Sequence, residues 1–174
     1  MIEKLKDTVR SIPDFPVKGI LFRDITPILS DSELSGFVID RMYGNVRGYQ
    51  IDAVVGIESR GFLFGMSLAQ KLGIGFLPAR KKGKLPYDTI SVKYKLEYGM
   101  AEIEMHKDAI QEGMHIHIHD DLLATGGTAH AVAKLIEEQG GIVSSFSFLI
   151  ELENLGGRKK LESFKSNIDS LIVY

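Results

Sequence analysis

Apolar residues in the first quarter of the chain recur at helical spacing, in two runs separated by a proline-rich stretch. Between residues 2 and 12 an apolar side chain falls at every third or fourth position, which predicts a helix that Pro13 stops. Residues 14–27 carry further prolines and a glycine and are expected to form a loop. Helical spacing resumes after this loop, so we predict a second helix that ends near Gly44.

The next stretch changes to the pattern of buried strands. The run IDAVVGI at 51–57 is short, apolar and rich in β-branched residues, which predicts a buried and parallel strand. The turn ESRG follows, and then a predicted helix over 62–72 that Gly73 closes. A further strand is expected at 75–80. This strand–turn–helix–strand order predicts a βαβ unit.

Residues 81–105 are more polar than the predicted core strands. They begin with a basic, turn-rich segment and then alternate apolar with polar side chains on both sides of Gly99. Strict alternation over this length predicts two strands of a hairpin. We therefore expect a flexible hairpin arm over about 81–105.

The remaining third returns to the alternation of strand and helix. Strands are predicted at 115–119, 144–152 and the C-terminal SLIVY, with a helix between the first two. The sequence thus predicts one α/β domain over 1–174, a doubly wound and mostly parallel sheet flanked by helices. Functional sites in such sheets lie at the carboxyl ends of the strands.

Composition excludes several classes of function but does not identify one. The 174 residues carry a formal net charge of −2, so no global basic field favours nucleic acid or an anionic membrane. There is no cysteine, which excludes disulfides, thiolate nucleophiles and cysteine-based zinc sites and suits a cytoplasmic protein. The N-terminus has no apolar core of signal-peptide length and no run of 18 apolar residues occurs, so neither a signal peptide nor a membrane span is expected.

The turn after the 115–119 strand has the composition of a phosphate-binding loop. Thr125, Gly126, Gly127 and Thr128 lead into a helix, where converging N–H groups and two hydroxyls can hold an anion. A glycine-bearing turn with a threonine N-cap is the structural alternative.

Asp120 and Asp121 precede this loop and change its interpretation. Two carboxylates would repel a phosphate unless a neutral group lies between them, and the hydroxyls of a ribose 5-phosphate satisfy that condition. Carboxylates beneath a ribose can also stabilise positive charge at its anomeric carbon, which makes both aspartates catalytic candidates. Neither GxxxxGK[ST] nor a GxGxxG after a strand is present, so nucleotide hydrolysis and dinucleotide binding are poorly supported.

DDLLATGGTA (120–129) resembles the 5-phosphoribosyl-1-pyrophosphate (PRPP) motif of the type I phosphoribosyltransferases, in the form found in enzymes that act on adenine. Five more segments resemble blocks of that family, in its order: LFRDITP (21–27), GIESRGFLFG (56–65), RKKGKLP (80–86), KLEYGMAEIEMHKDA (95–109) and ELENLGGRKKL (151–161). The resemblance implies the type I phosphoribosyltransferase fold, with a base-binding hood from about 1–30 plus a C-terminal segment. It also assigns Ala124 to the PRPP loop.

The family's pyrophosphate site corresponds to two segments of this chain. A turn after a strand that opens a helix can bind an anion, and Arg60 adds a cation there. Basic residues of the arm could compensate the charge of the departing pyrophosphate. The resemblance implies that pyrophosphate is bound by Glu58, Ser59, Arg60, Arg80, Lys81 and Lys84, with a cis peptide between the first two. It also implies that Arg80 reaches a partner subunit's site, hence a homodimer.

The base site is implied at four positions. By resemblance, adenine lies between the aromatic ring of Phe22 and Leu152, and backbone groups of Leu21 and Arg23 read its 6-amino group and N1. Taken by itself, Phe22 could equally be a core residue.

Glu97 is the candidate for proton transfer. Forming the N-glycosidic bond releases a purine proton, and related enzymes provisionally place this role on the glutamate of LEYG. Relatives that act on 6-oxopurines carry a catalytic aspartate where this chain has Ala124, which argues against hypoxanthine and guanine.

His115, His117 and His119 share one strand face and are the main departure from the family pattern. Three imidazoles could bind zinc, but a central strand leaves little room for a metal, so packed histidines are the preferred interpretation.

Together these features predict that adenine and PRPP give AMP and diphosphate in purine salvage, with Mg²⁺ bound through PRPP and no metal held directly by the chain. A phosphoribosyltransferase for another base, such as xanthine, and a PRPP-sensing regulatory protein remain as alternatives.

Overall fold

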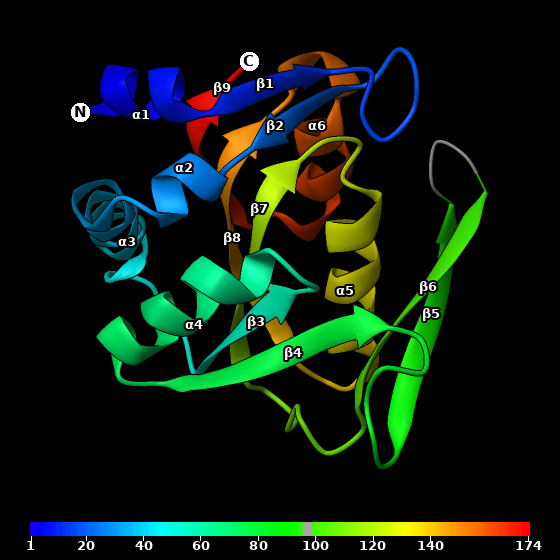
Figure 1. The fold of residues 1–174 in the computed structure, drawn as a ribbon. Coiled ribbons are helices and arrows are strands. Elements are labelled where there is room, and N and C mark those ends of the chain that lie inside the picture. The colour runs from blue at the N-terminus through cyan, green and yellow to red at the C-terminus, as the bar shows by residue number, and fades with distance from the viewer. Residues whose placement is uncertain (96–98) are drawn as a thin grey trace.

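A seven-stranded mixed sheet forms the centre of the computed structural model, which describes residues 1–95 and 99–174. Its order is β5-β6-β4-β3-β7-β8-β9 (Figure 1). The four pairings among β4, β3, β7, β8 and β9 are parallel, and β6 joins β4 and β5 antiparallel. The strands are β3 (Ala53–Ile57), β4 (Gly75–Lys81), β5 (Thr89–Lys95), β6 (Met100–His106), β7 (His115–Leu123), β8 (Ile142–Glu151) and β9 (Asn167–Val173).

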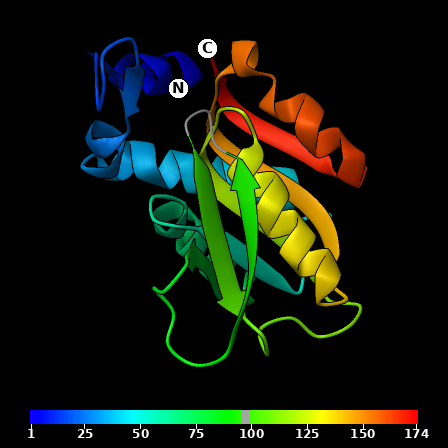
Figure 2. The same ribbon diagram turned by 90° about the vertical axis from the view of Figure 1, so that its right-hand side faces the viewer.

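Helices cover both faces of this sheet, which confirms the predicted doubly wound architecture. α3 (Ser32–Val46) and α4 (Gly61–Leu72) pack on one face, and α5 (Gly127–Glu138) and α6 (Gly157–Leu161) on the other (Figures 1 and 2). Each face has its own buried apolar cluster, since the strands of a parallel sheet are buried on both sides. No helix in the described part of the chain is long and apolar enough to cross a membrane.

The N-terminal segment differs from its prediction. The helix expected over 2–12 ends as α1 (Ile2–Thr8), and β1 (Arg10–Pro13) follows. The stretch expected as a loop contains β2 (Leu21–Asp24) and leads into α2 (Thr26–Leu29). Antiparallel pairing of β1 with β2, between residues about ten apart in sequence, overrides the local helical spacing.

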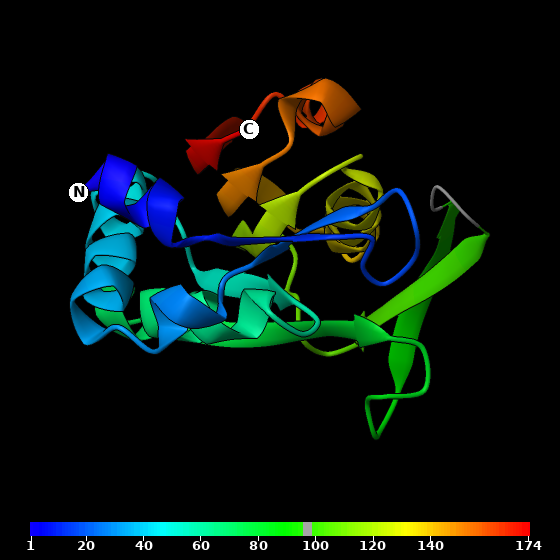
Figure 3. The same cartoon turned by 45° about the horizontal axis from the view of Figure 1, so that its top comes forward.

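The two strands lie across the end of the main sheet where β7 leads into α5 (Figure 3). Short helical turns at Glu153–Leu155 and Glu162–Phe164 flank α6 and were not predicted. Asp24 fixes the start of α2, because its carboxylate accepts hydrogen bonds from the backbone and hydroxyl of Thr26.

The hairpin of β5 and β6 is confirmed, and it is an integral edge of the sheet. β6 pairs with β4 through Arg80–Glu104 and Lys81–Ile103, and Ile103 and Met105 are fully buried. On β5, Val92 and Tyr94 pack against the buried cluster to which α5 contributes. Figure 2 shows the hairpin beside α5. The alternation thus marks a half-buried strand pair. Residues 96–98 lie outside the described part.

The three histidines of β7 form hydrogen bonds with the serines of β8. The ring nitrogens of His117 lie 2.8 and 2.7 Å from the hydroxyls of Ser145 and Ser147, and Nδ1 of His119 lies 2.9 Å from Ser147. Both histidines are fully buried, and His115 contacts Ser144 in the same way at 3.2 Å. Among the described residues no group of three or more His, Cys, Asp or Glu side chains is placed to hold a metal ion.

Burial keeps the imidazoles of His117 and His119 neutral. It lowers the pKa of His117 to about 3, with a further contribution from the neighbouring His119, and lowers the pKa of His119 to about 4. Both pKa values lie below the unfolded value of 6.5. Between these values the two histidines are protonated in the unfolded chain and neutral in the folded chain. Stability is therefore fully present above pH 6.5 and is lost as the pH falls toward the folded pKa values.

We expect the free energy of unfolding to fall as the pH is lowered from 7 to 5. Below pH 6, each of these two histidines should contribute about 1 kcal/mol per pH unit to that fall. His117→Gln, which cannot titrate, should remove about half of that slope in urea unfolding at several pH values. Met66→Leu, at an exposed position of α4 that does not titrate, is the control and should leave the slope unchanged. An unaltered slope in His117→Gln would contradict this assignment.

Candidate active site

The turn from β7 into α5 is a compact loop held by backbone contacts. Gly126 has a φ of +71°, which side-chain-bearing residues rarely adopt, and a Cβ there would lie 2.7 Å from the carbonyl oxygen of Gly157. A small cavity of about 70 Å³ opens at this loop. It is lined by Asp120 and by residues 122–129. All five predicted loop residues, Ala124 to Thr128, therefore surround one small concave space at a helix N-terminus, the geometry that binds anions.

β7 continues past the predicted 115–119 to Leu123, so Asp120 and Asp121 lie within the strand, near its carboxyl end and beside the start of α4. A Cβ on Gly61 would be 2.8 Å from the carbonyl oxygen of His119 and 3.0 Å from Oδ1 of Asp120, so only glycine lets α4 approach this closely. Burial, and then the neighbouring Asp121, raise the pKa of Asp120 well above its usual value. Burial also raises the pKa of Asp121, although Arg60 opposes that shift. The pair is thus poorly solvated and needs a cation or hydroxyl donors.

Arg60 supplies that cation and touches two other parts of the site. Its Nε lies 2.9 Å from Oδ2 of Asp121, whose side chain is only 5% exposed. Its Nη1 donates a 3.4 Å hydrogen bond to the carbonyl oxygen of Arg23, and its guanidinium carbon is 4.9 Å from the centre of the Phe22 ring. Arg60 therefore joins the turn after β3 to the carboxylates and to β2.

The two segments that carry the predicted pyrophosphate residues come together through the pairing of β3 with β4. Ile57 lies opposite Ala79, which brings Glu58 beside Arg80. One carboxylate oxygen of Glu58 accepts hydrogen bonds from Nε of Arg80 at 3.1 Å and from the backbone of Lys81 at 3.0 Å. The peptide between Glu58 and Ser59 is cis, as the resemblance implied.

Glu104 is a residue of this region that sequence reasoning missed. It is 1% exposed, and its carboxylate accepts backbone hydrogen bonds from Lys84 and Leu85 at 2.9 and 3.0 Å and one from the Thr89 hydroxyl. Burial alone would raise the pKa of Glu104, but these hydrogen bonds and Lys82 hold it below its usual value. Strand alternation gave no signal for it, because its role depends on a turn twenty residues earlier.

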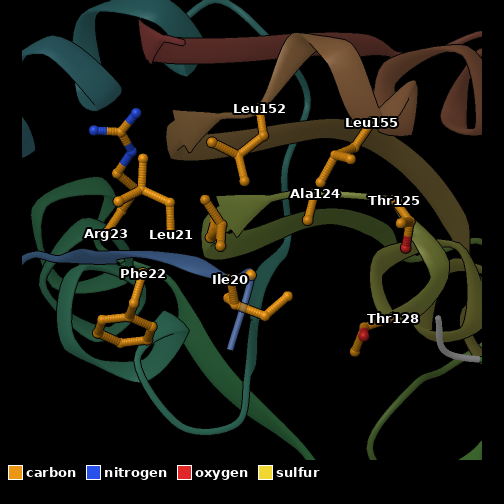
Figure 4. Close-up of a pocket in the computed structure, with 11 residues that line it drawn as sticks. Ile20, Leu21, Phe22, Arg23, Ala124, Thr125, Thr128, Leu152 and Leu155 are labelled. Atoms are coloured by element: carbon orange, nitrogen blue, oxygen red, sulfur yellow. The ribbon is translucent and has the colours of Figure 1, made fainter. Parts of the chain in front are cut away.

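A cavity of about 620 Å³ connects the predicted base site with the phosphate loop (Figure 4). β2 forms one wall, and Leu152 with Leu155 forms the opposite wall, while Thr125 and Thr128 lie at the far end. Phe22 points away from Arg23 on the other side of β2 and packs edge-on against Phe15. The full lining is Gly19, Ile20, Leu21, Phe22, Arg23, Leu122, Ala124, Thr125, Thr128, Leu152 and Leu155.

The hairpin also reaches this cavity. The Thr128 hydroxyl donates a 3.3 Å hydrogen bond to the Tyr94 hydroxyl, and a Cβ on Gly127 would lie 3.2 Å from the carbonyl oxygen of Lys95. The end of β5 therefore rests against the phosphate loop. Glu97, the candidate for proton transfer, lies outside the described residues.

The Arg60–Asp121 pair makes a testable energetic prediction. Arg60→Met should lower the free energy of unfolding by about 2 kcal/mol at pH 7, because it leaves a buried carboxylate without its cation. Adding Asp121→Asn should recover about 1 kcal/mol of that loss, since the uncompensated charge is then gone. The penalty should shrink at pH 5, where the raised pKa of Asp121 in the variant favours the neutral acid.

Urea unfolding of the two single variants and the double variant measures this coupling. Arg10→Met is the matched control, because Arg10 pairs with Asp24 at 3.2 Å with its side chain 63% exposed, and it should cost under about 0.5 kcal/mol. Equal costs for Arg60→Met and Arg10→Met would count against a central role of the buried pair.

Comparison with known proteins agrees with this geometry. Residues 29–170 match the family model described as "Phosphoribosyl transferase domain". An adenine phosphoribosyltransferase of Clostridium botulinum is 54% identical over 170 residues, which cover 98% of each chain. The crystal structure of adenine phosphoribosyltransferase from Thermoanaerobacter pseudethanolicus is 51% identical, covers all of both chains and superposes with a TM-score of 0.96.

A Saccharomyces cerevisiae adenine phosphoribosyltransferase, solved with an imino-altritol bisphosphate and adenine, is 40% identical, with 98% of this chain and 97% of that one covered and a TM-score of 0.90. Identity at these levels over nearly the whole chain shows more than a shared fold. The chain belongs to the phosphoribosyltransferase family, and within it to the adenine phosphoribosyltransferases.

Proposed function

We propose that this chain transfers the 5-phosphoribosyl group of PRPP to adenine, giving AMP and diphosphate, and so salvages purine. The observation that carries the proposal is the single cavity of about 620 Å³ shared by the β2 wall, Leu152 and the phosphate loop. A base and a ribose 5-phosphate joined by one glycosidic bond need such a continuous space, with an apolar end and an anion-binding end.

The ribose 5-phosphate end uses the residues around the β7–α5 turn. Backbone N–H groups from Thr125 to Thr128 and the two threonine hydroxyls hold the phosphate. Asp120 and Asp121 accept hydrogen bonds from the ribose hydroxyls, which replace part of the solvation that burial removes. When ionised, they also stabilise the positive charge that develops at the anomeric carbon as its bond to the pyrophosphate oxygen breaks.

The pyrophosphate end uses the turn after β3 and the start of the basic segment. The assigned residues are Glu58, Ser59, Arg60, Arg80, Lys81 and Lys84. Arg60 is a third exposed and can contact the leaving group while it remains beside Asp121. Lys81 and Lys84 are exposed and near the same turn, which supports their role as compensating cations. In the single chain Arg80 pairs with Glu58, and in the proposed homodimer it would reach the partner's site.

Mg²⁺ is proposed to enter with PRPP and to offset pyrophosphate charge through PRPP's own oxygens. The donor set fits that arrangement, because the Asp121 carboxylate is already paired with Arg60. The cytoplasm is the proposed location, consistent with a cysteine-free chain.

At the base end, Leu21, Phe22, Arg23 and Leu152 are proposed to hold adenine. Apolar side chains leave recognition of the ring edge to backbone groups, which offer a donor beside an acceptor. The new bond joins N9 of adenine to the anomeric carbon, and the proton from the purine passes to Glu97. Ala124 provides no carboxylate at the position where enzymes for 6-oxopurines carry one.

Substrate choice is tested by incubating the protein with PRPP, Mg²⁺ and each purine base in turn and following nucleotide formation. We expect adenine to react at least 100-fold faster than hypoxanthine, guanine or xanthine, because discrimination by hydrogen bonds to a ring edge is steep. Faster reaction of another base would overturn the choice of adenine. No turnover with any base would favour a PRPP-sensing regulator.

Glu97→Gln tests the proton-transfer role. We expect turnover to fall by about 100-fold or more, while the KM for PRPP changes less than about threefold, because general-base catalysis acts on the chemical step. Glu102→Gln on the same hairpin is the control and should keep near-normal turnover. Near-normal turnover in Glu97→Gln would remove this residue from the mechanism.

A further inference from the structure

Tyr174 follows β9 and forms backbone hydrogen bonds with the segment that carries Leu152. Its backbone N–H donates a 2.9 Å hydrogen bond to the carbonyl oxygen of Glu151, and its main-chain oxygen accepts one of 3.0 Å from the N–H of Glu153. These two bonds bracket Leu152 on both sides. The position of that side chain in the cavity wall therefore depends on where Tyr174 lies.

The side chain of Tyr174 extends in the other direction, to the N-terminal segment. Its ring lies under the guanidinium of Arg23, with 3.7 Å between the guanidinium carbon and the ring centre. Its hydroxyl donates a 3.1 Å hydrogen bond to the carbonyl oxygen of Lys6, whose ammonium group lies 4.9 Å from the same ring. Both chain ends thus meet at one side of the molecule (Figures 1 and 2).

Arg23 is held in place from a second side. Its Nη1 donates a hydrogen bond to the hydroxyl of Ser11 on β1, while its carbonyl oxygen accepts one from Arg60. The guanidinium is therefore stacked and oriented, so its contact with the Tyr174 ring stabilises this arrangement more than a contact between mobile surface side chains would. Burial raises the pKa of Tyr174, so its hydroxyl remains a donor at neutral pH.

The two walls of the base cavity come from segments about 130 residues apart, β2 and the residues after β8. Figure 4 shows them facing each other, with Arg23 at the end of one and Leu152 on the other. Tyr174 contacts both. The phosphate loop has a different support, because Gly126 packs against the backbone of Gly157. Contacts of Tyr174 are thus concentrated at the base end of the site.

We propose that Tyr174 is a positioning residue for the base: it sets the spacing between Leu152 and the Leu21–Arg23 wall. The inference rests on the proposed function, since the base is taken to lie between these walls. It predicts that disturbing Tyr174 changes the use of adenine selectively and leaves the use of PRPP almost unchanged.

The test is steady-state kinetics of AMP formation by the full chain with Tyr174→Leu and Tyr174→Phe. Tyr174→Leu loses the stacked ring and should raise the KM for adenine about tenfold, with the KM for PRPP within about twofold of wild type. Tyr174→Phe keeps the ring and should restore the KM for adenine to within about threefold. Tyr49→Leu, at a partly exposed tyrosine after α3, is the matched control.

A double variant isolates the contact itself. In an Arg23→Met background, which already lacks the cation over the ring, Tyr174→Leu should raise the KM for adenine by no more than about twofold. If Tyr174→Leu does not fold, Arg23→Met alone is the test, because it removes the same contact, and it should raise the KM for adenine about tenfold. A KM for adenine that rises tenfold in Tyr174→Phe as well would overturn the role of the ring.

Equal increases of both KM values, or an unchanged KM for adenine in folded Tyr174→Leu, would also overturn the inference. These outcomes differ from failure of the proposed function, in which wild type itself makes no AMP from adenine. In that case the base that wild type accepts replaces adenine in the same comparison.

Discussion

The pairing of Arg60 with Asp121 is the interaction on which the site depends. Asp120 and Asp121 lie near the carboxyl end of β7 in a poorly solvated position, where neighbouring carboxylates are unfavourable without a compensating cation. Arg60 reaches them because β3 is the parallel neighbour of β7, with Gly56 opposite His119. From β3 the chain winds outward through α4 to β4, whereas from β7 it winds through α5 to β8 in the opposite direction. The ion pair thus lies at the point where the strand order reverses, the usual place for a ligand in an open α/β sheet.

The same arginine explains why the N-terminal strands belong to the site. β2 has one partner strand, β1, and a two-stranded ribbon has little stability by itself. The hydrogen bond from Arg60 to the carbonyl oxygen of Arg23 and its contact with Phe22 connect this ribbon to the charged end of the sheet. A group that compensates the carboxylates therefore also orients the wall proposed to contact the base. Arg60 thus connects the charged end of the site with the apolar wall at its other end.

Features that depend on local patterns were predictable from the sequence, whereas those that depend on distant partners were not. The βαβ unit, the phosphate turn and the hairpin follow from hydrophobic period and glycine placement within about twenty residues. The prediction of helix for β1 was wrong because its apolar residues have helical spacing. Its strand conformation comes from pairing with β2, which the spacing does not reveal. Glu104 carried no signal because its hydrogen-bond donors lie on a separate turn. The serines opposite the histidines became meaningful only once the β7–β8 register was known.

The histidines show how a pattern typical of metal ligands can serve a packed core. A neutral imidazole has one donor and one acceptor nitrogen, and a serine hydroxyl can complement either. His117 satisfies both nitrogens with Ser145 and Ser147, so it is buried without an unpaired polar atom. Alternation on β7 places these side chains on the face toward α4, and Ile116 and Ile118 on the face toward α5. The strand that carries the carboxylates is thereby fixed on both faces, by hydrogen bonds on one and apolar packing on the other. Such a strand can hold two poorly solvated carboxylates near its carboxyl end, because the backbone beneath them has little freedom to relax away.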